Sequence, residues 1–274
     1  MQPPQLQPAA SVILLDPQRG GGEPFGIFLL QRQAKSRFMP GRFVFPGGRL
    51  EPSDGPDPDS DQARRTCALR ELWEEAGVVL AEEKERLARL TPDALEYCRR
   101  ELMRGALDLQ EAMTELGLSP DLEALLPYAR WITPAARSQR FDTTFYLARM
   151  PAGQKADCDR RETSQGVWLG PAAALGRGEG GGVSLAPPQV RILGELCGYA
   201  SLDELWDDCQ GRELEPIEPY MWVEGPRRMV LLPWDRGYAR RDVGDPEAPG
   251  RPCHPGRASR LVFREGAWLP YLKE

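Results

Sequence analysis

Three glutamates stand close together in the segment Arg-Glu-Leu-Trp-Glu-Glu-Ala-Gly-Val, residues 70–78. Glu71, Glu74 and Glu75 share one helical face, because residues three and four apart are neighbours on a helix. Carboxylates this close repel one another by about 3 kcal/mol per pair at an effective dielectric near 20. On a solvated face that repulsion is small, whereas in a cleft the cluster requires a cation. Carboxylate oxygens suit a hard divalent ion, so Mg²⁺ or Mn²⁺ is the expected cofactor.

A helix must position these carboxylates, and the flanking sequence carries the signals for one. Apolar residues recur at the spacing of an amphipathic helix, at Leu69, Leu72, Trp73 and Ala76. Asp59 or Ser60 can cap its start, and Gly77 can end it. Arg70 lies one turn before Glu74 and can brace that carboxylate. We therefore predict a capped helix with the three glutamates on its polar side.

The segment before this helix completes a pattern that identifies a family. Residues 43–48, Phe-Val-Phe-Pro-Gly-Gly, indicate an apolar strand that ends in a turn. The sequence closely resembles the Nudix hydrolases, whose signature is a glycine, a downstream glutamate, then Arg-Glu-apolar-x-Glu-Glu-x-Gly-apolar. Residues 70–78 match its second half without a departure, and Gly48 matches its first glycine. The resemblance implies an α+β protein, a Nudix α/β/α sandwich with a mixed sheet, and hydrolysis of a diphosphate linkage.

The resemblance also implies roles for the matching residues. Glu74 and Glu75 are expected to be metal ligands. Glu71 is expected to be a third ligand or the base that orients the attacking water. Arg70 is read as an electrostatic brace. On this basis we assign Glu71, Arg70 and Glu74 to catalysis.

Further candidates lie outside the matching helix. Gly47 and Gly48 allow the backbone to pass close to the metal cluster. Many Nudix enzymes take one more acidic ligand from a later loop. Glu162 is the first candidate, with Asp157 and Asp159 behind it, and a solvated loop is the alternative for all three. Side chains that flank the site and could bind the substrate are Arg32, Arg37, Arg42 and Phe38.

One part of the signature departs from the family pattern. The stretch PSDGPDPDSD lengthens the loop, so that Gly48 and Arg70 are 22 positions apart. The intermediate glutamate therefore has no unique counterpart. Asp54 lies at the right distance from Gly48, whereas Asp61 and Gln62 lie at roughly the right distance from the helix. That role stays open.

Composition limits the class of protein. The chain has 274 residues, a net charge of −6 and a pI of about 5.2, which argues against a nucleic-acid-coating surface. Six scattered cysteines and no signal-like N-terminus indicate reduced thiols in a cytoplasmic protein. The apolar segments are only strand-sized, so no membrane span is expected. The single histidine, His254, removes histidine-based zinc sites. A homodimer is one alternative for the oligomeric state.

The rest of the chain alternates between strands and helices. Strands are predicted at residues 11–16, 25–31, 128–133 and 140–150. Residues 81–126 contain three helical phrases, which a compact Nudix core does not need, so we read them as an insertion. The Nudix domain then covers residues 1–175. Residues 176–274 form an extension packed on the same domain, with a helix that begins at two prolines and two late strand pairs.

The whole-chain pattern bears on the substrate. The insertion, the helix led by Ala-Pro-Pro-Gln and the segment Leu-Leu-Pro-Trp-Asp-Arg-Gly-Tyr together resemble the subgroup that contains the peroxisomal coenzyme A diphosphatase, which also has a lengthened Nudix loop. This implies a small-molecule nucleoside diphosphate derivative, coenzyme A or acyl-coenzyme A. An ADP-ribose or nucleotide-sugar diphosphatase would use the same metal chemistry. A non-catalytic Nudix-fold binding module is the third reading, and the intact carboxylate set argues against it.

Overall fold

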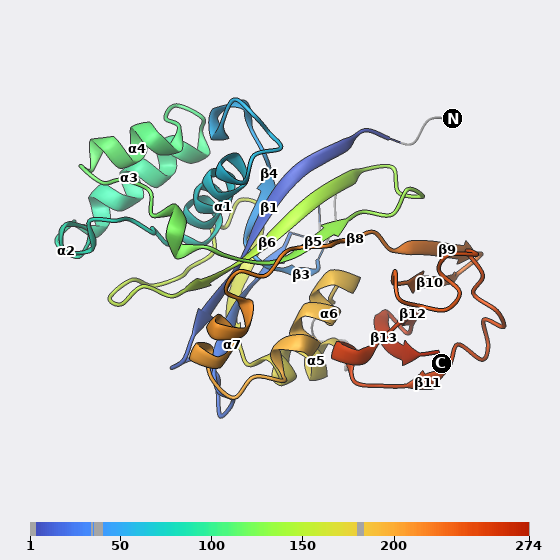
Figure 1. The fold of residues 1–274 in the computed structure, drawn as a ribbon. Coiled ribbons are helices and arrows are strands. Elements are labelled where there is room, and N and C mark those ends of the chain that lie inside the picture. Colours follow the sequence, from blue (N-terminus) through green and yellow to red (C-terminus); the bar gives the residue numbers. More distant parts are fainter. Residues whose placement is uncertain (1–3, 34, 36–40, 180–183, 274) are drawn as a thin grey trace.

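The computed structural model describes residues 4–33, 35, 41–179 and 184–273, and a mixed sheet of eight strands lies at its centre (Figure 1). The strands are β1 (Leu6–Asp16), β2 (Gly26–Arg32), β3 (Phe43–Val44), β4 (Gly47–Arg49), β5 (Leu126–Ile132), β6 (Arg140–Arg149), β7 (Thr163–Leu169) and β8 (Pro216–Ile217). Their order is β3-β2-β1-β6-β5-β8, with β4 also on β1 and β7 also on β2. Strand β1 pairs parallel with β6, and β5 with β8, whereas the other pairs are antiparallel.

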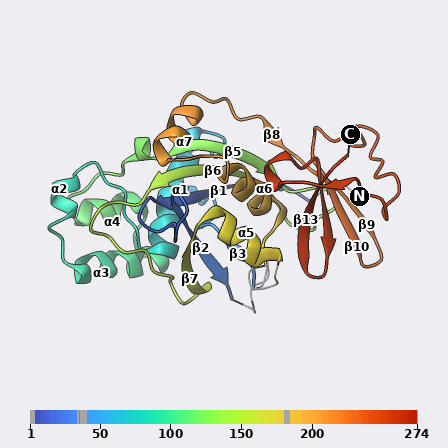
Figure 2. The same cartoon turned by 90° about the horizontal axis from the view of Figure 1, so that it is seen from below.

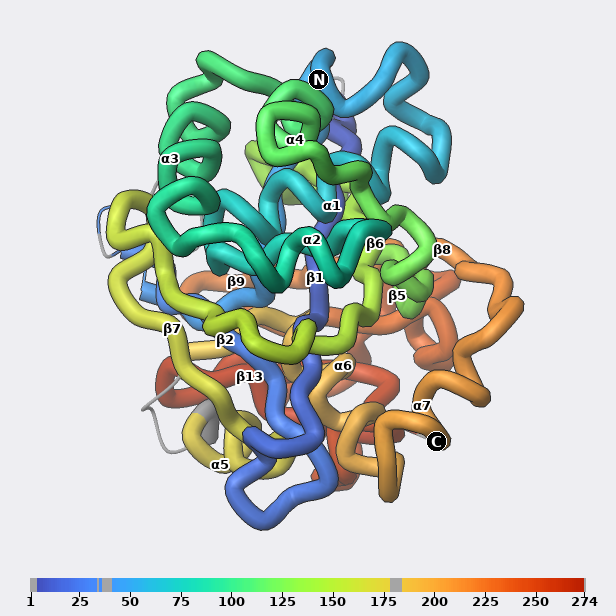
Figure 3. The backbone as a smooth tube through the Cα atoms, turned by 90° about the vertical axis from the view of Figure 1, so that its left-hand side faces the viewer, coloured from blue at the N-terminus to red at the C-terminus, as the bar shows by residue number. Residues whose placement is uncertain are grey.

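Helices cover both faces of this sheet, as Figure 3 shows. One face carries α1 (Asp61–Ala76), α2 (Lys84–Leu87), α3 (Pro92–Met103) and α4 (Leu109–Glu115), and the other carries α5 (Pro171–Glu179), α6 (Pro187–Leu196) and α7 (Leu202–Cys209). Successive side chains of a strand point to opposite faces. Accordingly Val12 and Leu14 of β1 lie in one apolar core, and Ile13 and Leu15 lie in the other. The predicted α/β/α sandwich with a mixed sheet is confirmed.

Helix α1 begins and ends through local hydrogen bonds. The Ser60 hydroxyl accepts the Ala63 N–H, so Ser60 rather than Asp59 is the N-cap. Gly77 ends the helix in the left-handed conformation, with φ of 70°, and donates its N–H to the Trp73 carbonyl at 2.9 Å. The apolar residues that predicted this helix are buried. Its polar side is thereby turned toward β4.

Residues 81–126 hold α2, α3, α4 and a 3-10 turn, Leu122–Ala124. Their apolar side chains, among them Cys98 and Leu102 of α3, share a core with Trp73 of α1. Residues 81–126 therefore extend the helical layer that covers α1. Within the described residues, no helix combines the length and the apolar composition needed to cross a bilayer.

The C-terminal part adds a second, antiparallel sheet of five strands, at the opposite end of the molecule from α2–α4 (Figure 2). Its strands are β9 (Tyr220–Glu224), β10 (Arg227–Leu231), β11 (Arg251–Pro252), β12 (Arg260–Arg264) and β13 (Ala267–Leu272). The two predicted strand pairs are β9/β10 and β12/β13. Val230 and Leu261 of this sheet lie in one apolar core with Leu193 of α6. A buried pair, Arg260 with Asp235, crosses its interior.

Candidate active site

Two glutamates of α1 lie against the backbone of β4. The Glu75 carboxylate accepts the Gly47 N–H at 2.9 Å and is 4% exposed. A Cβ atom on Gly48 would lie 2.3 Å from Oε1 of Glu71. Gly47 has φ of 155°, and a Cβ there would lie 2.5 Å from the Ala10 carbonyl oxygen. The glycine at position 48 therefore lets β4 lie close to the Glu71 carboxylate, and the glycine at position 47 lets β4 lie close to the backbone of β1.

Arg70 joins the remaining acidic groups. Its Nε and Nη2 donate to the two carboxylate oxygens of Asp54 at 2.8 and 2.9 Å. Its Nη1 donates to Glu71 at 2.9 Å and lies 3.6 Å from a carboxylate oxygen of Glu74. The Arg70 and Asp54 side chains are almost fully buried, at 4% and 1% exposure. A two-pronged pair of this kind fixes the orientation of the guanidinium as well as its position.

Of the candidates for the position that the sequence left open, Asp54 is the one that pairs with Arg70. It ends the 3-10 turn Pro52–Asp54 and lies at the expected spacing from Gly48. Asp61, the competing candidate, instead accepts hydrogen bonds from Tyr146 and Arg65, and Gln62 is exposed on the first turn of α1. The extra residues of the loop therefore lie after the acidic position rather than before it.

All three glutamates of α1 carry raised pKa values. Burial, against the opposing effect of Arg70 and with a further contribution from the charge of Glu74, raises the pKa of Glu71 to about 7. Burial also raises the pKa of Glu74. The pKa of Glu75 is raised well above its ordinary value, first by burial and then by Glu71. The cluster therefore has more negative charge than its surroundings compensate.

This donor set fits a hard divalent cation. The positive charge of Arg70 is already paired with Asp54. The carboxylates of Glu71, Glu74 and Glu75 are therefore only partly neutralised by this arginine. Among the described residues, no three acidic, histidine or cysteine side chains are already gathered as metal ligands. Arg70 and the Gly47 N–H each hold a carboxylate oxygen, of Glu71 and Glu75 respectively. Turning these oxygens to a shared divalent cation would offset the negative charge of the cluster.

Glu162 lies next to this cluster, on the loop that enters β7. Its charge contributes to the raised pKa values of Glu71 and Glu75, and its carboxylate lies 3.5 Å from Nη2 of Arg32. The Glu162 side chain is 67% exposed, so it is free to turn toward a cation. Asp159, by contrast, accepts the backbone N–H groups of Arg161, Glu162 and Thr163 and so shapes the loop itself.

The predicted substrate-binding residues separate into three groups. Arg32 lies beside Glu162, and its buried Nε has no hydrogen-bond partner among the described residues. Arg42 donates to the Leu185 carbonyl at 3.3 Å, and its pKa is lowered by burial and then by two further arginines, Arg137 and Arg228. Among the residues that the structure describes, the Arg42 side chain makes no hydrogen bond to the carboxylate cluster. Residues 37 and 38, the predicted arginine and stacking phenylalanine, lie outside the described residues.

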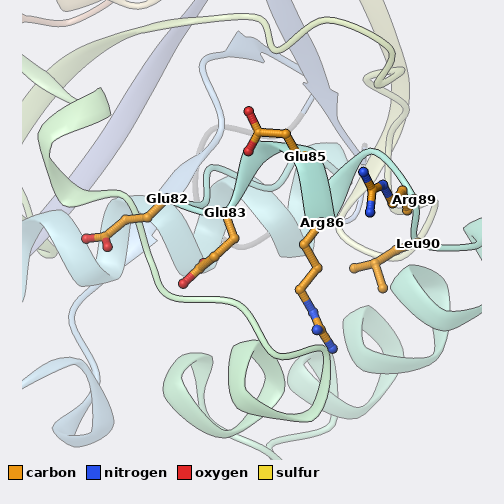
Figure 4. Close-up of a pocket in the computed structure, with 6 residues that line it drawn as sticks. All are labelled: Glu82, Glu83, Glu85, Arg86, Arg89 and Leu90. Atoms are coloured by element: carbon orange, nitrogen blue, oxygen red, sulfur yellow. The ribbon is translucent and has the colours of Figure 1, made fainter.

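A surface pocket is present elsewhere, on the insertion (Figure 4). Its lining residues are Glu82, Glu83, Glu85, Arg86, Arg89 and Leu90. Three of these residues are acidic, two are basic and one is apolar, and none of them belongs to the carboxylate cluster of α1. The glycines of β4 do not reach this pocket, so the chemistry is assigned to α1 and β4.

Comparison with known protein families shows which family the chain belongs to. A NUDIX domain model matches residues 5–102, and a NUDT19 Nudix domain model matches residues 55–196, more than half of the chain. The chain belongs to the Nudix hydrolase family. The acyl-coenzyme A diphosphatase NUDT19 of Xenopus laevis is 27% identical, in an alignment that covers 80% of this chain and 71% of that protein. That of Gallus gallus is 29% identical, covering 88% of this chain and 81% of the other.

A solved structure shows the same Nudix fold. The NUDIX hydrolase from Alicyclobacillus acidocaldarius superposes with a TM-score of 0.65 at 26% identity, covering 74% of this chain and 96% of that one. The sequence named Asp54 from its spacing to Gly48, but it could not show the pair that Asp54 makes with Arg70. It gave no signal for Arg99, which donates to the Glu74 carbonyl, because that partner is a backbone atom.

Proposed function

We propose that this Nudix hydrolase cleaves the diphosphate linkage of coenzyme A or its acyl thioesters, with Mg²⁺ or Mn²⁺. The observation that carries the proposal is the match of the NUDT19 Nudix domain over residues 55–196, which holds α1 and its complete carboxylate set. Relatives named acyl-coenzyme A diphosphatase align with 79–88% of the chain. The insertion and the C-terminal extension are therefore shared at least in part with such enzymes.

The carboxylates of α1 would hold the metal, with Glu74 and Glu75 as ligands and Glu162 as a further one. A bound divalent ion neutralises charge on the diphosphate oxygens and lowers the pKa of a water molecule. Arg70, fixed by Asp54, keeps Glu71 and Glu74 oriented on α1. Glu71 is a third ligand or the base that orients water, and its raised pKa places it near the working pH of a base.

Arg32 is suited to bind the substrate. Its guanidinium lies at the edge of the carboxylate cluster, and its Nε is buried without a partner. A buried donor without an acceptor costs about 1–3 kcal/mol, which an incoming phosphate oxygen would recover. Arginine also makes forked contacts to phosphate. We propose that Gly47 and Gly48 let the backbone of β4 lie close to the bound metal and substrate. Arg42 could bind the substrate only if its side chain gave up its hydrogen bond to the Leu185 carbonyl.

The thiols support a proposal for the compartment. The six cysteines are free, and four of them are buried. Unpaired cysteines of this number are typical of a reducing compartment, and we propose the cytoplasm.

The test of the substrate compares coenzyme A and ADP-ribose on one preparation of the protein. Both contain a diphosphate, but only coenzyme A has a pantetheine arm and a 3′-phosphate. We expect a kcat/KM for coenzyme A or an acyl-coenzyme A at least tenfold above that for ADP-ribose. A preference for ADP-ribose or a nucleotide sugar would overturn the coenzyme A assignment, and the metal chemistry would still stand.

A further inference from the structure

We propose that Arg99, on the insertion helix α3, is a positioning residue for the metal site. It ties the C-terminal end of α1 to the loop that carries Glu162. The inference deepens the proposed function and rests on it, since it concerns the same carboxylates. It also gives the insertion a role in catalysis that does not require contact with substrate.

Arg99 makes its hydrogen bonds to the backbone of two separate segments. Its Nε and Nη2 donate to the Glu74 carbonyl oxygen at 3.0 and 2.9 Å. The same Nη2 donates to the Asp157 carbonyl oxygen at 3.3 Å. Arg99 is only 9% exposed, so these bonds are shielded from water. The carbonyls of a last helical turn have no partner within the helix, and this guanidinium supplies one to a metal-ligand residue.

The end of α1 is shaped around this guanidinium. Gly77 follows the helix in the left-handed conformation, and a Cβ there would lie 2.9 Å from Nη1 of Arg99. The Asp157 N–H donates to the Ala76 carbonyl at 3.0 Å. Helix α1, helix α3 and the loop before β7 therefore meet at one joint. A positive charge at a helix C-terminus is also favoured by the helix dipole.

The loop between Asp157 and Glu162 is shaped by hydrogen bonds of the Asp159 carboxylate and of the backbone. Asp159, two residues after Asp157, accepts the Glu162 N–H at 3.1 Å. The Glu162 carbonyl accepts the Gln33 N–H at 3.0 Å, which ties this end of the loop to the end of β2. The loop is thus held at one end by Arg99 and at the other by β2. The position of Glu162 relative to Glu74 depends on both attachments.

Packing of the insertion does not itself require this arginine. Cys98 and Leu102 of α3 are buried in one core with Trp73 of α1. These apolar contacts hold α3 against α1. The hydrogen bonds of Arg99 are therefore not needed to attach α3, and they orient the end of α1 relative to the loop before β7. Groups that orient metal ligands without touching the metal typically change affinity or activity by about 10–100-fold when they are removed.

The test replaces Arg99→Met, which keeps an unbranched stem and removes the donors. Arg65→Met is the matched control. Arg65 lies on α1, is similarly buried, at 14% against 11% side-chain exposure, and donates to the Leu122 and Leu125 carbonyls at 2.7 Å each. Its ion-pair partner is Asp61, and among the described residues it makes no hydrogen bond to the carboxylate cluster or to the loop before β7. Mn²⁺ binding to substrate-free protein is measured by titration calorimetry, and thermal unfolding by circular dichroism.

We expect Arg99→Met to weaken Mn²⁺ binding by about tenfold or more and to lower kcat at subsaturating Mn²⁺, with KM for substrate little changed. Arg65→Met should lower Tm and keep Mn²⁺ affinity within about twofold of wild type. Equal Mn²⁺ affinity in wild type and Arg99→Met would overturn the proposal, as would equal weakening in Arg65→Met.

The Arg99→Lys variant keeps the positive charge and a single donor group. It should therefore bind Mn²⁺ with an affinity between those of wild type and Arg99→Met. If Arg99→Met does not fold, Arg99→Lys decides, and wild-type affinity in that variant refutes the inference. A wild-type protein that binds Mn²⁺ in an Arg99-dependent way but cleaves no diphosphate would refute the proposed function alone. A wild-type protein that binds no Mn²⁺ would refute both.

Discussion

Without its metal, the protein should lose stability as the pH rises through neutrality. Burial raises the pKa of Glu71 from 4.5 to about 7, with Arg70 opposing the shift. The folded state therefore binds the proton more tightly than the unfolded state, and the free energy of unfolding falls as the pH rises from the unfolded pKa to the folded one. The full difference corresponds to about 3 kcal/mol, of which about 2 kcal/mol falls between about pH 5.5 and about pH 8.

Other titrating carboxylates either add to this trend or act outside its pH range. The pKa of Glu75 is raised well above its ordinary value, mainly by burial, so Glu75 destabilises the metal-free protein in the same direction. Asp142 and Asp235 have lowered pKa values, despite burial, because Arg130 and Arg260 donate to them. Their contribution is present above the unfolded pKa and is lost only in more acidic solution.

The assay is denaturant unfolding in excess EDTA at the two pH values, for wild type and for Glu71→Gln. We expect wild type to be less stable at the higher pH by about 2 kcal/mol or more, and Glu71→Gln to show a smaller loss. Saturating Mn²⁺ should restore stability most at the higher pH, where the carboxylates are ionised. Metal-free wild type that is equally stable at both pH values, or a Glu71→Gln curve that falls as steeply, would refute the reasoning.

Three further substitutions or deletions test separate parts of the site. Glu74→Gln should keep the circular dichroism spectrum and lower kcat by roughly a hundredfold or more, and an unchanged kcat would remove Glu74 from the ligand set. Asp54→Asn should cost about 3–5 kcal/mol of unfolding free energy because it leaves the buried Arg70 without its main partner, and a loss under about 1 kcal/mol would show that Glu71 suffices. Shortening the exposed stretch between Asp54 and Ser60 should change kcat less than about threefold, and a collapse of Mn²⁺ affinity would place one of its aspartates among the ligands.

Much of the fold was predictable because its signals are local. The continuous apolar runs in residues 11–16 and 25–31, separated by a glycine-rich turn, predicted β1 and β2, since each strand buries its side chains on both faces of the sheet. Helix α1 was predictable from its caps and its periodicity. The Arg-Glu…Glu-Glu pattern then located the carboxylates, because residues three and four apart must be neighbours once the helix forms.

The remaining features depend on contacts between distant segments. The lengthened loop hid the choice of Asp54, because spacing could be counted from either end and only the pair with Arg70 distinguishes them. Arg42 flanks the glycines in sequence, yet its side chain turns to Leu185. Arg99 acts on backbone carbonyls of residues far away in the chain, and backbone partners leave no residue-type signal.

The most direct test of the account is hydrolysis of coenzyme A with and without a divalent cation, followed by mass spectrometry of the products. The account predicts that Mg²⁺ or Mn²⁺ supports cleavage of the diphosphate into 3′,5′-ADP and phosphopantetheine, and that excess EDTA abolishes it. Addition of Mn²⁺ beyond the chelator should restore the rate. Cleavage that continues undiminished in EDTA would contradict the assignment of Glu71, Glu74 and Glu75 as metal ligands.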